Sequence, residues 1–221
     1  MRHIPLPAPR RSWPRQDGIA LLTALVLMLA VLMTGIASTR GALQSARAAA
    51  HERDRVLALQ MADAALRDAE REIEGGAAPG SARANAILGG SADAFIGGCL
   101  GAHPYNGLCA HDADPDRYLD LLADDDGPAL FFGAYTGATL PAGEGGLPAE
   151  TPRYLIELMP TSATGQLYRI GARGAGSLSG TRAAVQAYYR KSPDGSPGRR
   201  VGWREIGNWS QRYAAARAAA R

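Results

Sequence analysis

The chain has 221 residues, enough for one modest soluble domain with a membrane segment but short for two full domains. Its formal charge of +3 arises in residues 1–18, where four arginines accompany Asp17, and the rest of the chain carries 20 basic and 20 acidic residues. This balance removes the electrostatic argument for nucleic acid as a primary partner. The basic N-terminus indicates instead a segment retained on the cytoplasmic side of a membrane.

Residues 19–37 form an uncharged stretch of 19 residues. As a helix it would measure about 29 Å, close to the hydrocarbon thickness of a bilayer. A cleavable secretory signal has a shorter apolar core, although small residues near Ala37 offer a cleavage site for one. Because no proline occurs between Pro14 and Pro79, we expect the helix to continue beyond the apolar stretch.

The second part of this helix is predicted to be amphipathic. Apolar residues recur at every fourth position, namely Leu57, Met61, Ala65, Ala69 and Ile73. Gly75 and Gly76 end the pattern. We therefore expect one helix over about 19–74, with a transmembrane half at 19–38 and an amphipathic half at 39–74. A plain membrane anchor with a helical stalk would give the same pattern.

These residues resemble a known family. A basic leader that ends in Gly18 and passes directly into an apolar helix looks like a type IV prepilin. RQDGIALLTALVLMLAVLMTG and ERDRVLALQMADAALRDAEREIE are similar to the N-terminal region of PilX-type minor pilins, and YRIGARGAGSLSGTRAAVQAYYR resembles the strand pair that ends their globular domain. The resemblance covers about 15–75 and 150–210.

The resemblance implies processing by prepilin peptidase, with residues 1–18 as leader, Gly18 as its last residue and Ile19 as the new N-terminus. Most pilins have a glutamate at the fifth mature position, where it is thought to pair with a neighbour's ammonium in the filament core. This chain has Thr23 there. Threonine can bond to a carbonyl one turn back but cannot neutralise an amine. Thr23 is either a tolerated change at a lipid-facing position or the mark of a subunit at the filament tip. Tip pseudopilins of type II secretion systems resemble this chain in lacking that glutamate.

Residues 75–150 are rich in Gly, Ala, Asp and Pro, and we expect them to be mostly loop. Cys99 and Cys109 would lie in the oxidising periplasm, which favours a disulfide. The alternative is a zinc site that also uses His103 and His111, but the spacing fits none of the recurrent zinc patterns. We expect no metal and no cofactor.

Seven aspartates crowd residues 112–126. Alternate carboxylates suggest calcium, yet the glycine and the final glutamate of an EF-hand loop are missing. The other interpretation makes Asp114 or Asp116 the cap of a helix over RYLDLLA and places residues 124–126 in a solvated turn.

Residues 151–209 are predicted to form an antiparallel sheet of three or four strands. TPRYLIELMP, GQLYRIGARG and TRAAVQAYYRK alternate as half-buried strands, and VGWREIGNW could add a fourth. The amphipathic helix would cover the apolar face of this sheet, giving an α+β, type IV pilin-like fold. The Ala-rich tail at 210–221 could be helical, but we favour a frayed end.

We find no catalytic constellation in the sequence. The glycine-rich GARGAG does not fit a dinucleotide-binding loop, because it follows a strand but opens into another strand rather than a helix. We therefore expect a structural protein and not an enzyme: a minor pilin of a type IV pilus, inserted in the inner membrane with its C-terminal domain in the periplasm, then assembled into the pilus. The implied partners are prepilin peptidase, other minor pilins, the major pilin and a tip adhesin. A minor pseudopilin of type II secretion and a membrane-anchored periplasmic binding module are the alternatives.

Overall fold

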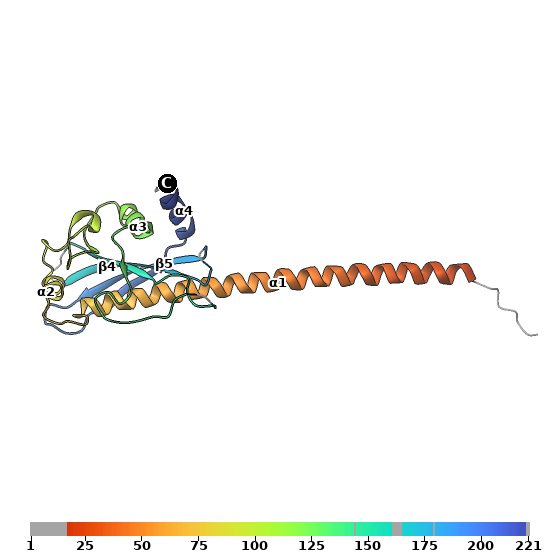
Figure 1. Cartoon of the computed structure of the whole chain (residues 1–221), viewed down its shortest axis with the longest axis horizontal. Coiled ribbons are helices and arrows are strands. Elements are labelled where there is room, and N and C mark those ends of the chain that lie inside the picture. The colour runs from red at the N-terminus through yellow and green to blue at the C-terminus, as the bar shows by residue number, and fades with distance from the viewer. Residues whose placement is uncertain (1–16, 144, 161–164, 179, 220–221) are drawn as a thin grey trace, which may run out of the picture. The chain divides into compact units, whose positions relative to one another are not determined.

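A computed structural model describes residues 17–143, 145–160, 165–178 and 180–219. Most of the expected leader, residues 1–16, lies outside the described residues. The chain divides into two compact units, Met1–Ala49 and Ala50–Arg221. Helix α1 (Asp17–Ile73) runs through both, and its ends lie within two residues of those expected from the sequence (Figure 1).

The segment at 75–150 contains more regular structure than the sequence suggests. It holds α2 (Ala82–Gly89), the short 3-10 helix η1 (Gly97–Cys99), β1 (Leu108–Ala110), α3 (Pro115–Ala123) and β2 (Leu130–Phe131). Both α-helices begin at capping residues, because the side chains of Ser81 and Asp114 accept hydrogen bonds from backbone N–H groups of the first turn. The helices are too short to show a sustained period, which explains why the segment resembles loop in the sequence.

The sheet has six strands in the order β1-β3-β4-β5-β6, with β2 paired to part of β3. The four longer strands are β3 (Arg153–Leu158), β4 (Gln166–Ala175), β5 (Arg182–Lys191) and β6 (Arg199–Glu205). They are antiparallel, as predicted. The short strand β1 runs parallel to β3 and makes the sheet mixed. The α+β prediction is confirmed, and the sheet is larger than expected.

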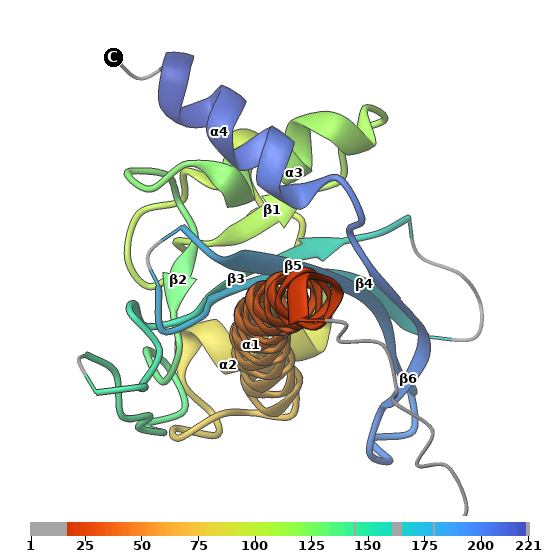
Figure 2. The same ribbon diagram turned by 90° about the vertical axis from the view of Figure 1, so that its right-hand side faces the viewer.

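The sheet is covered on both faces, whereas the sequence suggested a half-buried one. Tyr168, Ile170 and Ala172 of β4 join the core that α1 covers. On the other face, residues of α3 and α4 (Trp209–Ala219) form a second core with Leu155 and Ala184. Figure 2 shows the sheet between α1 and α2 on one side and α3 and α4 on the other. Arg169 and Arg173 of β4 are therefore almost fully buried.

The face of α1 that packs on the sheet differs slightly from the predicted ridge. Ala58 and Ala62 are completely buried, while the neighbouring Leu57 and Met61 are only half-buried. The reason is a close approach to β4. A Cβ atom on Gly174 would lie 2.5 Å from both the carbonyl oxygen of Ala58 and the amide nitrogen of Ala62. Small side chains are required where the helix and the strand come this close.

The tail from residue 209 is helical, so the expectation of a frayed end is wrong up to Ala219; the last two residues lie outside the described part. Trp209 and Tyr213 of α4 are buried in the second core. Arg212 pairs with Asp116 and Asp120 of α3. Packing of this kind orders a short Ala-rich helix that would be marginal by itself.

Candidate functional site

The first half of α1 exposes many large apolar side chains. They are Ile19, Leu21, Leu22, Leu25, Val26, Leu27, Met28, Leu29, Val31, Leu32, Met33 and Ile36. The most apolar window of the helix has a mean hydropathy of 2.6, and none of it is buried within the chain. By length and composition this helix can cross a membrane.

The predicted processing junction between Gly18 and Ile19 lies in the first described turn of α1, which begins at Asp17. Both residues are exposed, and no atom beyond the adjacent helix lies within 4 Å of a Cβ placed on Gly18. Nothing in the described residues packs on the junction.

Thr23 makes its hydrogen bonds within the helix. Its hydroxyl Oγ1 lies 3.1 Å from the carbonyl oxygen of Ile19 and 3.0 Å from that of Ala20. This is the bond to the preceding turn expected from the sequence, and it satisfies the hydroxyl in an apolar environment. Thr34 bonds to the preceding turn in the same way. The side chain of Thr23 is therefore neutral and satisfied inside its own helix.

The segment that contains the junction and Thr23 matches a known family model. Residues 17–67 match the model described as PilX N-terminal. This segment of the chain is similar to the PilX N-terminal domain. The resemblance to PilX-type type IV pilins is thus confirmed for this segment. No curated protein and no solved structure matches the chain.

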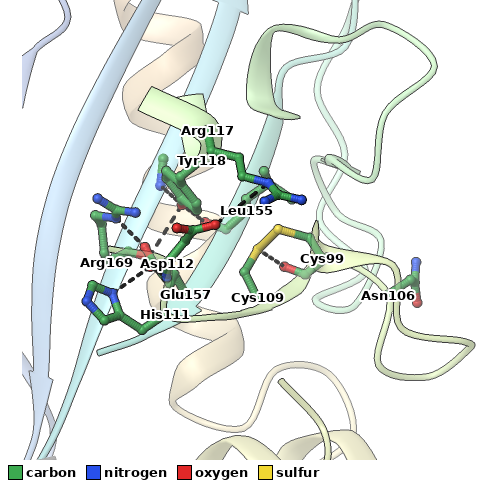
Figure 3. The surroundings of a disulfide bond; sticks show 12 residues. Cys99, Asn106, Cys109, His111, Asp112, Arg117, Tyr118, Leu155, Glu157 and Arg169 are labelled. Carbon is green, nitrogen blue, oxygen red and sulfur yellow. Dashed lines mark hydrogen bonds and ion pairs between the residues drawn. A yellow bond between two sulfur atoms is a disulfide. The ribbon is translucent and has the colours of Figure 1, made fainter. Parts of the chain in front are cut away.

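The globular part carries the expected disulfide between Cys99 and Cys109 (Figure 3). Both half-cystines are buried, and their sulfur atoms are not thiolates that could bind zinc. His103 stacks on Tyr135, with 6.4 Å between the ring centroids, and His111 bonds to Glu157. In the described ranges, no group of three or more His, Cys, Asp or Glu residues could hold a metal ion.

A buried ion pair holds the disulfide loop against α1. Arg83 of α2 pairs with Glu72 of α1, and each side chain is only 3% exposed. Arg83 also donates hydrogen bonds to the carbonyl oxygens of Pro104 and Asn106 inside the loop. Tyr154 completes the network by donating its hydroxyl to Glu72. The sequence gives little signal for this pair, because Glu72 lies in a run of charged helical residues that resembles a solvated face.

A second buried carboxylate follows the disulfide. Glu157 of β3 accepts hydrogen bonds from the Arg169 side chain and from the backbone N–H of Asp112, and it lies 2.9 Å from Nδ1 of His111 (Figure 3). The guanidinium carbon of Arg169 lies 4.3 Å from the ring centroid of Tyr118. Burial raises the pKa of the Tyr118 hydroxyl far above its usual range, so the hydroxyl stays protonated. These contacts join the end of the disulfide loop to the sheet.

The Asp-rich segment at 112–126 is used for capping and ion pairs. Asp114 caps α3, which confirms the helix-cap interpretation. Asp125 pairs with Arg173 and accepts a hydrogen bond from Tyr213. Asp116 and Asp120 pair with Arg212. These carboxylates face different partners, and no three of them converge in the described structure.

Proposed function

We propose that this protein is a minor pilin that prepilin peptidase cleaves after Gly18, that anchors in the inner membrane through α1, and that then enters a pilus at or near its tip. Within this scheme it helps to start pilus assembly, and it works with other minor pilins, the major pilin and a tip adhesin in adhesion and motility. The observation that carries the proposal is the match that begins at Asp17 and contains both the Gly18–Ile19 junction and Thr23.

The state of Thr23 supports a position at the tip. In the pilins that this chain resembles, a glutamate at this position is thought to pair with the ammonium of a neighbouring subunit inside an apolar core. The hydroxyl of Thr23 bonds to carbonyl oxygens of its own helix, and the side chain carries no charge. A subunit of this kind suits the end of a filament, where the pair with a further subunit is not required.

The processing step is tested by mass spectrometry of the protein purified from membranes and from sheared pili. We expect an N-terminus at Ile19 with a methylated amine. A Gly18→Arg variant provides the matched control and should keep the complete leader. A wild-type protein that still begins at Met1 would contradict the proposal and favour a membrane-anchored periplasmic module.

The position in the filament is tested by labelling sheared pili with antibody. We expect label at one end of each filament, and we expect Thr23→Glu to move label into the shaft or to reduce piliation. Thr23→Val, which removes the hydroxyl without adding charge, should retain the end label. Uniform label along the shaft that does not change with Thr23→Glu would reject the tip position. Secretion defects with normal pili in a deletion strain would favour a type II secretion pseudopilin.

A further inference from the structure

Strand β6 forms one edge of the sheet. It pairs with β5, and no other strand of the described residues pairs with its outer side. The N–H of Ile206 donates to the carbonyl oxygen of Ala184 on β5. Since backbone groups alternate in direction along a strand, the N–H and C=O of Trp203 and Glu205 point away from β5. The outer side of β6 therefore offers backbone donors and acceptors for another strand.

The face of β6 that lies on the α1 side has balanced charges. Arg200 pairs with Glu70, and Glu205 pairs with Arg55, both on α1. Between these pairs lies Trp203, which is opposite Ala187 and is 49% exposed. Val201, at the irregularity in the β5–β6 pairing, is 44% exposed. Two large apolar side chains, Trp203 and Val201, are therefore exposed along this edge between the two ion pairs.

The opposite face of the same edge is positively charged. Arg190 of β5 and Arg199 of β6 are directly paired residues, and Arg204 lies opposite Gln186. Arg199 and Arg204 are exposed, and Nε of Arg190 is buried without a hydrogen-bond partner. Within the described part of the chain, none of these three arginines forms an ion pair with a carboxylate, although the arginines buried elsewhere in the sheet do.

Like charges at directly opposed positions destabilise a sheet, and opposite charges there stabilise it. An added strand beside β6 would bring its own side chains next to Arg199 and Arg204 on one face and next to Trp203 on the other. We propose that the free edge of β6 binds an extended acidic segment of a partner protein as an additional strand. Carboxylates of that segment face Arg199 and Arg204, and an apolar side chain packs on Trp203.

A protein strand fits this edge better than a nucleic acid does. A phosphodiester chain would use the three arginines, and its oxygens could accept from the outward N–H groups of β6, but the phosphodiester has no donor for the outward C=O groups. An added strand pairs with both kinds of group and gains specificity from its alternate side chains. The exposed Trp203 and Val201 also favour a partner with an apolar face.

The proposal is tested with the full chain in detergent and labelled peptides of about ten residues, the length of a long strand. The probe alternates aspartate with valine, and binding is measured by fluorescence anisotropy at about 0.15 M salt, where charges more than about 8 Å apart are screened. We expect Arg199→Glu combined with Arg204→Glu to weaken binding at least about tenfold, a loss on the scale of single charge pairs at interfaces. Arg217→Glu, an exposed arginine on α4, is the matched control and should change binding less than about twofold.

Two further probes use the unaltered protein and decide the question even where a variant fails to fold. A peptide of the same sequence with alternate amides N-methylated keeps its charge but loses one row of strand donors, and it should bind at least about tenfold more weakly. An oligonucleotide of equal charge should bind more weakly than the acidic peptide. Equal binding of the methylated peptide, or tighter binding of the oligonucleotide, would overturn strand addition and leave a general anion-binding surface.

Discussion

At the scale of single residues, the buried ion pair of Glu72 and Arg83 connects α1, α2 and the disulfide loop. A buried pair is costly to break, since removing one partner leaves the other charge unpaired in a medium of low polarity. The carboxylate of Glu72 also accepts the hydroxyl of Tyr154 from the sheet. Glu72 thus links α1 to α2 and to the sheet, and Arg83 extends the network to the disulfide loop.

Glu72→Ala should lower the free energy of unfolding by about 3–5 kcal/mol, because it leaves Arg83 buried without its carboxylate. The matched control is Glu52→Ala on the same helix. Glu52 has a side chain that is 69% exposed and lies 4.0 Å from Arg55, so its loss should cost less than about 1 kcal/mol. Chemical denaturation followed by circular dichroism measures both. Equal losses in the free energy of unfolding would show that the buried pair stabilises the fold no more than an exposed pair does.

At the scale of elements, α4 illustrates why the C-terminal end was predicted incorrectly. Its alanines carry no pattern, and its order depends on Trp209 and Tyr213, which contact strands and a helix far away in the sequence. The burial of two arginines on β4 was also missed, in this case because the sequence pattern indicates exposure. Arg169 and Arg173 alternate with apolar residues as solvent-facing residues do, yet Glu157 and Asp125 neutralise them under α3 and α4. The long helix and the four long strands were predictable because their periods extend over many residues.

Trp209→Ala should lower the free energy of unfolding by about 3–5 kcal/mol, as expected for removal of a large buried aromatic side chain. Trp203→Ala is the matched control, since Trp203 is half-exposed and its removal leaves no closed cavity. We expect that control to lose less than about half as much. If denaturation curves of the two variants coincide, the packing of Trp209 on α4 does not stabilise the domain.

The attachment of α4 should also depend on pH. Glu150 accepts two hydrogen bonds of 2.6 Å from Arg182, whose guanidinium carbon lies 4.1 Å from the ring centroid of Tyr213. The hydrogen bonds from Arg182 lower the pKa of Glu150 below its ordinary value of 4.5. Because the pKa is lower in the folded state, the stabilisation is complete above 4.5 and is lost as the pH falls through the folded value.

Thermal unfolding midpoints of wild type and Glu150→Gln, measured between about pH 6 and pH 3, test this dependence. The wild type should lose more of its melting temperature on acidification than Glu150→Gln, which has no carboxyl group to titrate at this position. Glu52→Gln is the control and should follow the wild-type curve, because the Glu52 side chain is 69% exposed and lies 4.0 Å from its partner Arg55. Parallel curves for wild type and Glu150→Gln would contradict the expected linkage.

At the scale of the whole molecule, the division into two compact units has a practical consequence. Residues 50–221 contain both cores, all six strands and the disulfide. Expressed alone in an oxidising compartment, this unit should fold without detergent and unfold in one cooperative transition. Size-exclusion chromatography and calorimetry provide the measurement, and reduction of Cys99–Cys109 should lower stability by about 3 kcal/mol. Aggregation of the oxidised unit would show that the first half of α1 is needed for folding.

The contact of Ala58 and Ala62 with Gly174 limits how the domain can change over evolutionary time. Most packing defects can be compensated, because a neighbour can shrink when one side chain grows. Here a side chain on Gly174 would meet backbone atoms of Ala58 and Ala62, which no substitution at these two positions can remove. Second-site suppressors of a bulky substitution at Gly174 should therefore be absent from positions 58 and 62 of α1. A genetic screen would recover only true revertants or changes elsewhere that stabilise the domain globally.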